Sequence, residues 1–97
     1  RAFAEANKLP VTTAFRNADL IDNRHPQYIG NIGLGSEPSL SKRIKDSDLV
    51  IAVGPRLGEI TSAGYTLFDI PVPKQPLVHV HGGADELGRV YEATLMI

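Results

Sequence analysis

The chain has 97 residues, no cysteine and a formal net charge of −1 at pH 7. This length allows one small domain, the lack of cysteine excludes disulfides and thiolate metal sites, and the net charge gives no sign of the basic surface typical of nucleic-acid binding. Every apolar run is shorter than the roughly 18 residues that cross a membrane. We therefore expect a soluble, cytoplasmic domain without nucleic-acid or membrane partners.

The N-terminal third predicts one helix, one strand and a long loop. Residues 1–8 are rich in alanine, and Pro10 ends the predicted helix because proline lacks the amide hydrogen that continues it. The β-branched residues of Val11 to Phe15 predict a short strand. Arg16 to Gly35 is polar and predicts a structureless loop, of a length that usually carries a function or lies at an interface.

The middle of the chain predicts a helix followed by a buried strand. Ser36 to Ser39 combines serines of the capping type with a proline in the first turn, which predicts a helix start. This helix should end near Asp46 to Asp48. The run from Leu49 to Gly54 is continuously apolar and predicts a strand buried on both faces, as in parallel sheets covered by helices.

The C-terminal third continues the alternation of helices and strands. Leu77 to His81 predicts a second buried strand, residues 84–91 a short helix or turn, and Ala93 to Ile97 a last strand. The alternation predicts an α/β fold, a Rossmann-like parallel sheet with flanking helices. Because the chain opens within a predicted helix and closes on an apolar run, we expect the sheet to be truncated at one or both ends.

Candidate binding residues lie where predicted strands or loops end, since ligands of parallel sheets collect at the carboxyl ends of the strands. A glycine allows close backbone approach, and an arginine offers paired donors to phosphate. A glycine before a helix start is also a potential phosphate contact. The alternative for each is a tight turn or a surface side chain. The candidate nucleotide contacts are Phe15, Arg16, Gly33, Gly54, Arg56, His81 and Gly82.

No metal site and no catalytic residue is predicted. His79 and His81 share one face of a predicted strand, but no third ligand has a suitable spacing. We expect His79 to pack under a helix and His81 to reach the strand's carboxyl end. The acidic residues have no spacing that forces a catalytic pair together, and no serine lies in a nucleophile elbow.

Three stretches, in order along the chain, together resemble one enzyme family. They are Phe15 to Pro26, Val53 to Glu59, and Val78 to His81 with the following Ala84 to Gly88. The set is similar to the central domain of thiamine-diphosphate-dependent enzymes of the acetolactate-synthase type, and the resemblance covers nearly the whole chain.

The resemblance implies that residues 1–97 are a single, partial central domain of a larger three-domain enzyme. In that family the other domains bind thiamine diphosphate and Mg²⁺, through an activating glutamate and a Gly-Asp-Gly motif that this chain lacks. The larger enzyme would be a lyase or transferase that decarboxylates a 2-keto acid and transfers the acyl group. This fragment alone would be inactive, and its partners would be the missing N- and C-terminal domains and further copies in a homo-oligomer.

Flavin binding is a further implication. Gly54 and Arg56 match the Gly-x-Arg of FAD-carrying relatives, whereas Leu57-Gly58 stand where those relatives often have Phe-Asp. FAD or ADP binding and a purely structural role therefore both stay open. A free-standing nucleotide-binding or regulatory module is the alternative. A phosphate-receiver domain would need an aspartate at a strand end, where this chain has Phe15, Gly54 and His81.

Overall fold

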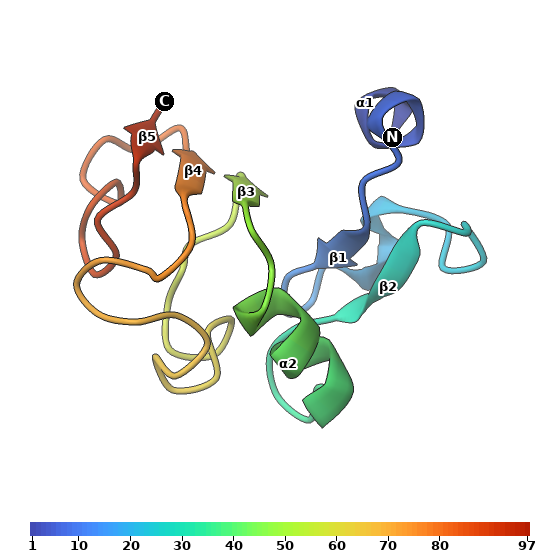
Figure 1. The fold of residues 1–97 in the computed structure, drawn as a ribbon, viewed down its shortest axis with the longest axis horizontal. Helices are drawn as coiled ribbons and strands as arrows, with labels where there is room; N and C mark the ends of the chain where they lie inside the picture. Colours follow the sequence, from blue (N-terminus) through green and yellow to red (C-terminus); the bar gives the residue numbers. More distant parts are fainter.

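The structure, a computed structural model, describes all 97 residues (Figure 1). Its elements in chain order are α1 (Ala2–Asn7), β1 (Val11–Thr13), the 3-10 helix η1 (Ala18–Leu20), β2 (Tyr28–Asn31), α2 (Pro38–Lys45), β3 (Val50–Val53), β4 (Leu77–Val80) and β5 (Leu95–Met96). None of its helices is long and apolar enough to span a bilayer.

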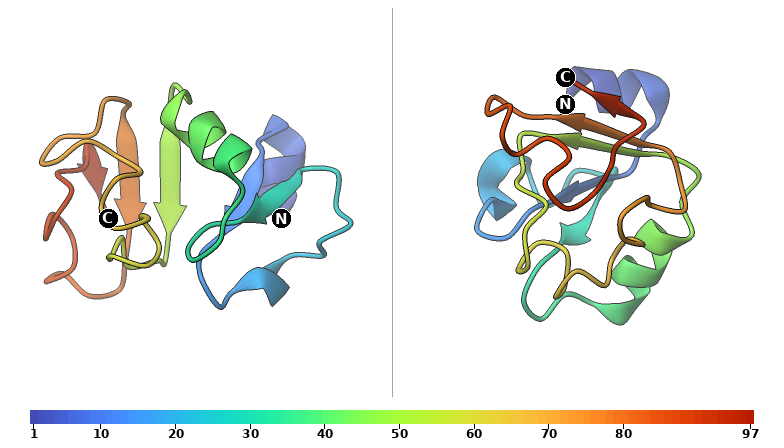
Figure 2. Two further views of the ribbon diagram at one scale, coloured as in Figure 1. Left: turned by 90° about the horizontal axis from the view of Figure 1, so that it is seen from below. Right: turned by 90° about the vertical axis from the view of Figure 1, so that its left-hand side faces the viewer.

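All strand pairs are parallel, and the strands form two sheets. β1 pairs with β2, and a three-stranded sheet has the order β3-β4-β5. The two sheets lie side by side, with α1 and α2 on opposite faces (Figures 1 and 2). The predicted α/β class, with parallel strands and flanking helices, is confirmed.

The hydrophobic core covers one face of the three-stranded sheet. Helix α2 contributes Leu40 and Ile44, which lie four residues apart and so project from the same side of the helix. The sheet contributes Ala52 and Leu77, and the connections after β3 and β4 supply the remaining core residues, Leu57, Leu67, Phe68 and Tyr91. The connections from β2 to β3, from β3 to β4 and from β4 to β5 therefore all pack on the same face.

The opposite face of this sheet is uncovered, which corrects one prediction. β3 was expected to be buried on both faces, but Ile51 is 42% exposed and Val53 is 71% exposed. Only Ala52 of this strand is buried. The continuous apolar run indicates a strand built to be covered twice, and within this chain α2 and the loops cover it once.

The predicted structureless loop from Arg16 to Gly35 is wrong in part, because it contains η1 and β2. β2 is stabilised by polar contacts, and its sequence has no alternating hydrophobic pattern. The Asn31 side-chain amide donates to the carbonyl oxygens of Thr13 and Ala14, at 3.1 and 2.8 Å. The Thr12 hydroxyl donates to the Gly30 carbonyl oxygen at 2.7 Å. A strand built on such contacts is invisible to a search for alternating apolar residues.

Helix α2 begins with Pro38 in its first turn and ends at Lys45, close to the prediction. The expected serine cap is wrong. Glu37 is the N-cap residue, and no side chain bonds to the free amides of the first turn. The Ser36 hydroxyl instead donates to the Gly33 carbonyl oxygen at 3.0 Å. Ser36 therefore stabilises the turn before the helix and not the helix itself.

Candidate functional site

The carboxyl edge of the three-stranded sheet brings two candidate residues together. The Gly54 amide donates to the Val80 carbonyl oxygen at 2.7 Å, and the His81 amide donates to the Ile97 carbonyl oxygen at 3.0 Å. Gly54 and His81 therefore directly follow neighbouring strands at the same edge. This is the position at which parallel sheets bind ligands.

The backbone at this edge is open. Gly54 has a φ of +88°, a conformation that favours glycine, and no atom lies within 4 Å of the position that a Cβ would take. Gly82 has equally open space around it. A ligand can therefore approach the main chain at both positions without displacing a side chain.

Arg56, the cationic candidate at this edge, is held by an acidic side chain. Its Nε donates to Glu86 at 3.3 Å, while Arg89 donates to the other Glu86 oxygen at 3.2 Å. Burial raises the pKa of Glu86, but the hydrogen bonds and charges of Arg89 and Arg56 outweigh it and leave that pKa below its usual value. The Arg56 side chain is 68% exposed, so its outer nitrogens remain accessible.

The two histidines have separate surroundings. His79 is 2% exposed, and its Nε2 lies 2.9 Å from the Pro55 carbonyl oxygen. The predicted burial of His79 is correct, but the turn after β3 covers it and not a helix. His81 accepts the Gly83 amide hydrogen on Nδ1 at 2.9 Å. No group of three His, Asp or Glu side chains is placed to hold a metal ion.

The remaining candidates belong to the two-stranded sheet. Gly33 packs against Phe15, with 2.9 Å between the Phe15 Cβ and the position that a Cβ of residue 33 would take. The Arg16 guanidinium lies 5.4 Å from the centre of the Phe15 ring. These three residues lie together, but on a different sheet from Gly54 and His81. The predicted contacts therefore form two clusters, one at the carboxyl end of each sheet.

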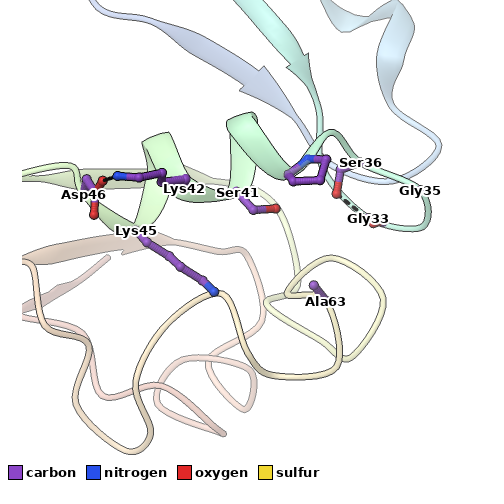
Figure 3. A pocket seen from close by; sticks show the side chains of 9 residues that line it. Gly33, Gly35, Ser36, Ser41, Lys42, Lys45, Asp46 and Ala63 are labelled. Atoms are coloured by element: carbon purple, nitrogen blue, oxygen red, sulfur yellow. Dashed lines mark hydrogen bonds and ion pairs between the residues drawn. The ribbon is translucent and has the colours of Figure 1, made fainter.

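A groove runs along α2 from the turn that contains Gly33 (Figure 3). It has a volume of about 610 Å³, is open, and has one hydrophobic residue in its lining. Of the seven candidate contacts, only Gly33 lines this groove. Ser41 and Lys45 line it from the helix. Lys42 is paired with Asp46, whereas Lys45 has no acidic partner within ion-pair distance. Two sequence signals fall in this groove: Gly33 before the helix start, named above as a potential phosphate contact, and the spacing of Ser41, Lys42 and Lys45 along one side of the helix.

Comparison with known proteins gives a family match and several similar proteins. The family described as "Thiamine pyrophosphate enzyme, central domain" matches residues 1–97. The chain is 33% identical, over 84% of its length, to a 3D-(3,5/4)-trihydroxycyclohexane-1,2-dione hydrolase of Clostridium perfringens. It is 32% identical over 70% of its length to such a hydrolase of Bacillus cereus.

A further relative is the large subunit of acetolactate synthase isozyme 2 of Escherichia coli, 24% identical over 96% of this chain. The chain spans only 13% of the length of the clostridial hydrolase and 16% of that of the synthase subunit. The family match over the full chain agrees with the ordered motifs of the sequence. The chain belongs to the family of central domains of thiamine pyrophosphate enzymes.

Proposed function

We propose that this chain is the non-catalytic, architectural central domain of a thiamine-diphosphate-dependent enzyme of the acetolactate-synthase type. The longer polypeptide that would contain it is called the parent here. The observation that carries the proposal is the family match over residues 1–97, combined with relatives of which the chain spans only 13 to 16%. The parent would decarboxylate a 2-keto acid and transfer the acyl group, as a cytoplasmic homo-oligomer.

The residues of this chain do not fit thiamine diphosphate with Mg²⁺. Binding a diphosphate through Mg²⁺ takes carboxylate or amide oxygens that meet at one point, and no cluster of three acidic or histidine side chains exists here. Glu86, the least exposed acid with a shifted pKa, is already engaged by Arg56 and Arg89. We therefore assign the thiamine diphosphate and Mg²⁺ sites to the other domains of the parent.

The test uses the glutamates of this chain, Glu5, Glu37, Glu59, Glu86 and Glu92. Each is changed to glutamine in the parent, and proton exchange at the reactive carbon of bound thiamine diphosphate is followed by NMR. Bound thiamine diphosphate supplies a carbanion there, and a glutamate activates it. We expect every variant to exchange at the wild-type rate. A loss of about 100-fold or more in any of them, the size of a missing acid–base group, would show that this domain takes part in the chemistry.

A nucleotide site for FAD or ADP is the second candidate function. The open backbone at Gly54 and Gly82, with Arg56 beside it, favours this candidate. Glycine-lined strand ends with a nearby guanidinium suit a diphosphate. The ion pair with Glu86 competes with such a ligand for the same guanidinium.

The nucleotide site is tested by thermal unfolding of the parent with ADP and with FAD. Ligand binding to the folded state raises the unfolding midpoint by mass action. The proposal predicts a midpoint increase that is lost in Arg56→Ala and kept in Arg43→Ala, whose arginine lies exposed on α2. Equal shifts in both variants, or no shift in the wild type, would leave the domain with an architectural role alone.

A further inference from the structure

The groove along α2 contains one charged side chain that no residue of the chain neutralises. Lys42 is paired with Asp46, the single acidic residue of the lining. The hydrogen bond and the charge of Lys42, with a smaller contribution from Lys74, hold the pKa of Asp46 below its usual value, so this pair stays ionised. Lys45 belongs to the same lining and has no acidic partner. The groove therefore carries a net positive charge.

Ser41 and Lys45 offer free hydrogen-bond donors on one side of the helix. They lie four residues apart, so their side chains project from the same face, and both line the groove (Figure 3). The hydroxyls of Ser36 and Ser47 donate to main-chain carbonyl oxygens, whereas the Ser41 hydroxyl and the Lys45 ammonium have no bond within the chain. The two oxygens of a carboxylate can accept from an ammonium and from a hydroxyl.

The wall of the groove across from the helix is fixed by the chain itself. It is the loop after β3, in which Ala63, Gly64 and Tyr65 have φ angles of 53°, 67° and 61°. A residue other than glycine keeps such a left-handed backbone only where its surroundings determine it. Here the Gly64 amide donates to the Glu59 carbonyl oxygen at 2.7 Å, and the Thr66 hydroxyl donates to that of Ala63 at 2.6 Å. A binding partner would therefore meet a surface that is already shaped.

The character of the groove fits a protein surface better than a small molecule. Small-molecule sites are mostly apolar and enclose their ligand, but this groove is open and has one hydrophobic residue in its lining. A single small anion on one exposed lysine is held weakly, and a volume of about 610 Å³ has room for several side chains. Interfaces between domains of one polypeptide are more polar than obligate interfaces. The groove has the composition of such an interface.

We propose that the groove along α2 docks a carboxylate-bearing segment of the parent outside residues 1–97, whose Asp or Glu oxygens accept from Lys45 and Ser41. The inference rests on the proposed function in one respect, that the chain is part of a longer parent. The chain spans 13% of the clostridial hydrolase and 16% of the synthase subunit, so relatives of this kind have most of their residues outside it. The proposal assigns the face through which the architectural domain is joined to the rest of the enzyme.

Carbodiimide cross-linking of the wild-type parent, followed by peptide mass spectrometry, tests this docking. The reagent joins an amine to a carboxylate that is already in contact with it. We expect Lys45 to be joined to an aspartate or glutamate outside residues 1–97. The yield of this link should fall at least about fivefold when NaCl is raised to about 1 M, because the screening length then falls to about 3 Å.

Two serine variants of α2 provide a matched comparison, and both keep the Lys45 amine. Ser41→Asp places a carboxylate four residues before Lys45, where it pairs with the ammonium within the helix. The link from Lys45 to the rest of the parent should then be lost. Ser39→Asp makes the same change of charge on the same helix, but Ser39 is exposed and does not line the groove. The link should be kept in this variant.

Three results would overturn the docking proposal. With no link at Lys45 in the wild type, the groove would be left to solvent or to a small anion. Links from Lys45 only to residues 1–97 would mean contacts within the chain or with a second copy of it. Equal yields in the two serine variants would separate the link from the groove. The readout needs no bound cofactor, so a parent that fails to bind thiamine diphosphate would overturn the proposed function without affecting the docking.

Discussion

Gly33 is the residue with the tightest steric constraint in the candidate site. It is buried, has a φ of +132°, and faces Phe15 so closely that an added Cβ would lie 2.9 Å from the Phe15 Cβ. Gly35, two residues later, has a φ of +70° and open space around it. The two glycines thus separate the effect of packing from the effect of backbone conformation.

We predict that Gly33→Ala lowers the free energy of unfolding by at least about 2 kcal/mol, because it adds a steric clash to a backbone conformation that only glycine adopts readily. Gly35→Ala should cost about 1 kcal/mol, the strain of a left-handed residue alone. Urea denaturation of both variants measures the difference. Equal losses would mean that Phe15 moves away freely and that this contact does not define the turn.

Tyr91 is a buried polar residue without a partner. It is 2% exposed, and its hydroxyl has no hydrogen bond of ordinary geometry, although the Ser62 hydroxyl lies close enough to lower the Tyr91 pKa against the effect of burial. By contrast, the fully buried Ser62 donates to the Gly58 carbonyl oxygen at 2.6 Å. A buried hydroxyl costs free energy when it is unpaired and contributes when it is bonded.

We predict opposite effects of removing these two hydroxyls. Tyr91→Phe should raise the free energy of unfolding by about 1 kcal/mol, and Ser62→Ala should lower it by about 1 kcal/mol. Chemical denaturation at neutral pH measures the sign of the change in the free energy of unfolding for each variant. A loss of stability in Tyr91→Phe would show that the phenol has a bonding partner.

The buried phenol of Tyr91 should also make the stability of the protein depend on pH. Burial raises the pKa of Tyr91. The folded state therefore keeps the phenol neutral to a higher pH than the unfolded state does. Its contribution to stability is complete below the unfolded pKa of roughly 10 and declines as the pH rises above it. Tyr91→Phe should lose less stability than the wild type in this alkaline range.

At the scale of elements, α2 joins the two parts of the fold. Its Leu40 is buried in the core of the three-stranded sheet. The Leu40 Cδ2 also lies 3.0 Å from the position of a Cβ on Gly30 of β2. One side chain thus packs against the three-stranded sheet and against the two-stranded sheet.

We predict that Leu40→Ala lowers the free energy of unfolding by about 2–4 kcal/mol, the usual cost of a cavity left by a buried leucine. Arg43→Ala, on the exposed side of α2, is the matched control and should leave the denaturation midpoint unchanged. If both variants unfold at the same denaturant concentration, α2 does not support the core.

Elements with a hydrophobic signal could be predicted from the sequence, and polar ones could not. The apolar runs at β3 and β4 and the spacing of Leu40 and Ile44 give the correct strands and helix. β2 was missed because amide and hydroxyl hydrogen bonds hold it. Within the site, the pairing of Gly54 with His81 follows from parallel topology. The contact of Gly33 with Phe15 does not, because local spacing carries no information on which loops meet.

On the scale of the whole molecule, one face of the three-stranded sheet is apolar and uncovered. Ile51 and Val53 of β3 project from it, and Leu95 lies in register with Val78 on the same side. Leu95 is 52% exposed. Such a face promotes association between molecules.

We predict that the 97-residue chain self-associates with rising concentration and that Val53→Lys weakens this association. Val72→Lys is the control, since Val72 is 58% exposed but lies in a loop outside the sheet. Sedimentation velocity over a range of concentrations measures the effect. A wild-type chain that stays monomeric throughout, or equal effects of the two lysines, would contradict the role of this face.

The central claim is that this domain has an architectural role in an enzyme whose thiamine diphosphate binds to other domains. Calorimetric titration of thiamine diphosphate with Mg²⁺, into the parent and into the 97-residue chain, tests it most directly. We predict saturable, Mg²⁺-dependent binding to the parent and no binding heat with the chain, which has no cluster of metal-ligating side chains. Saturable binding to the chain alone, or none to the parent, would contradict the account.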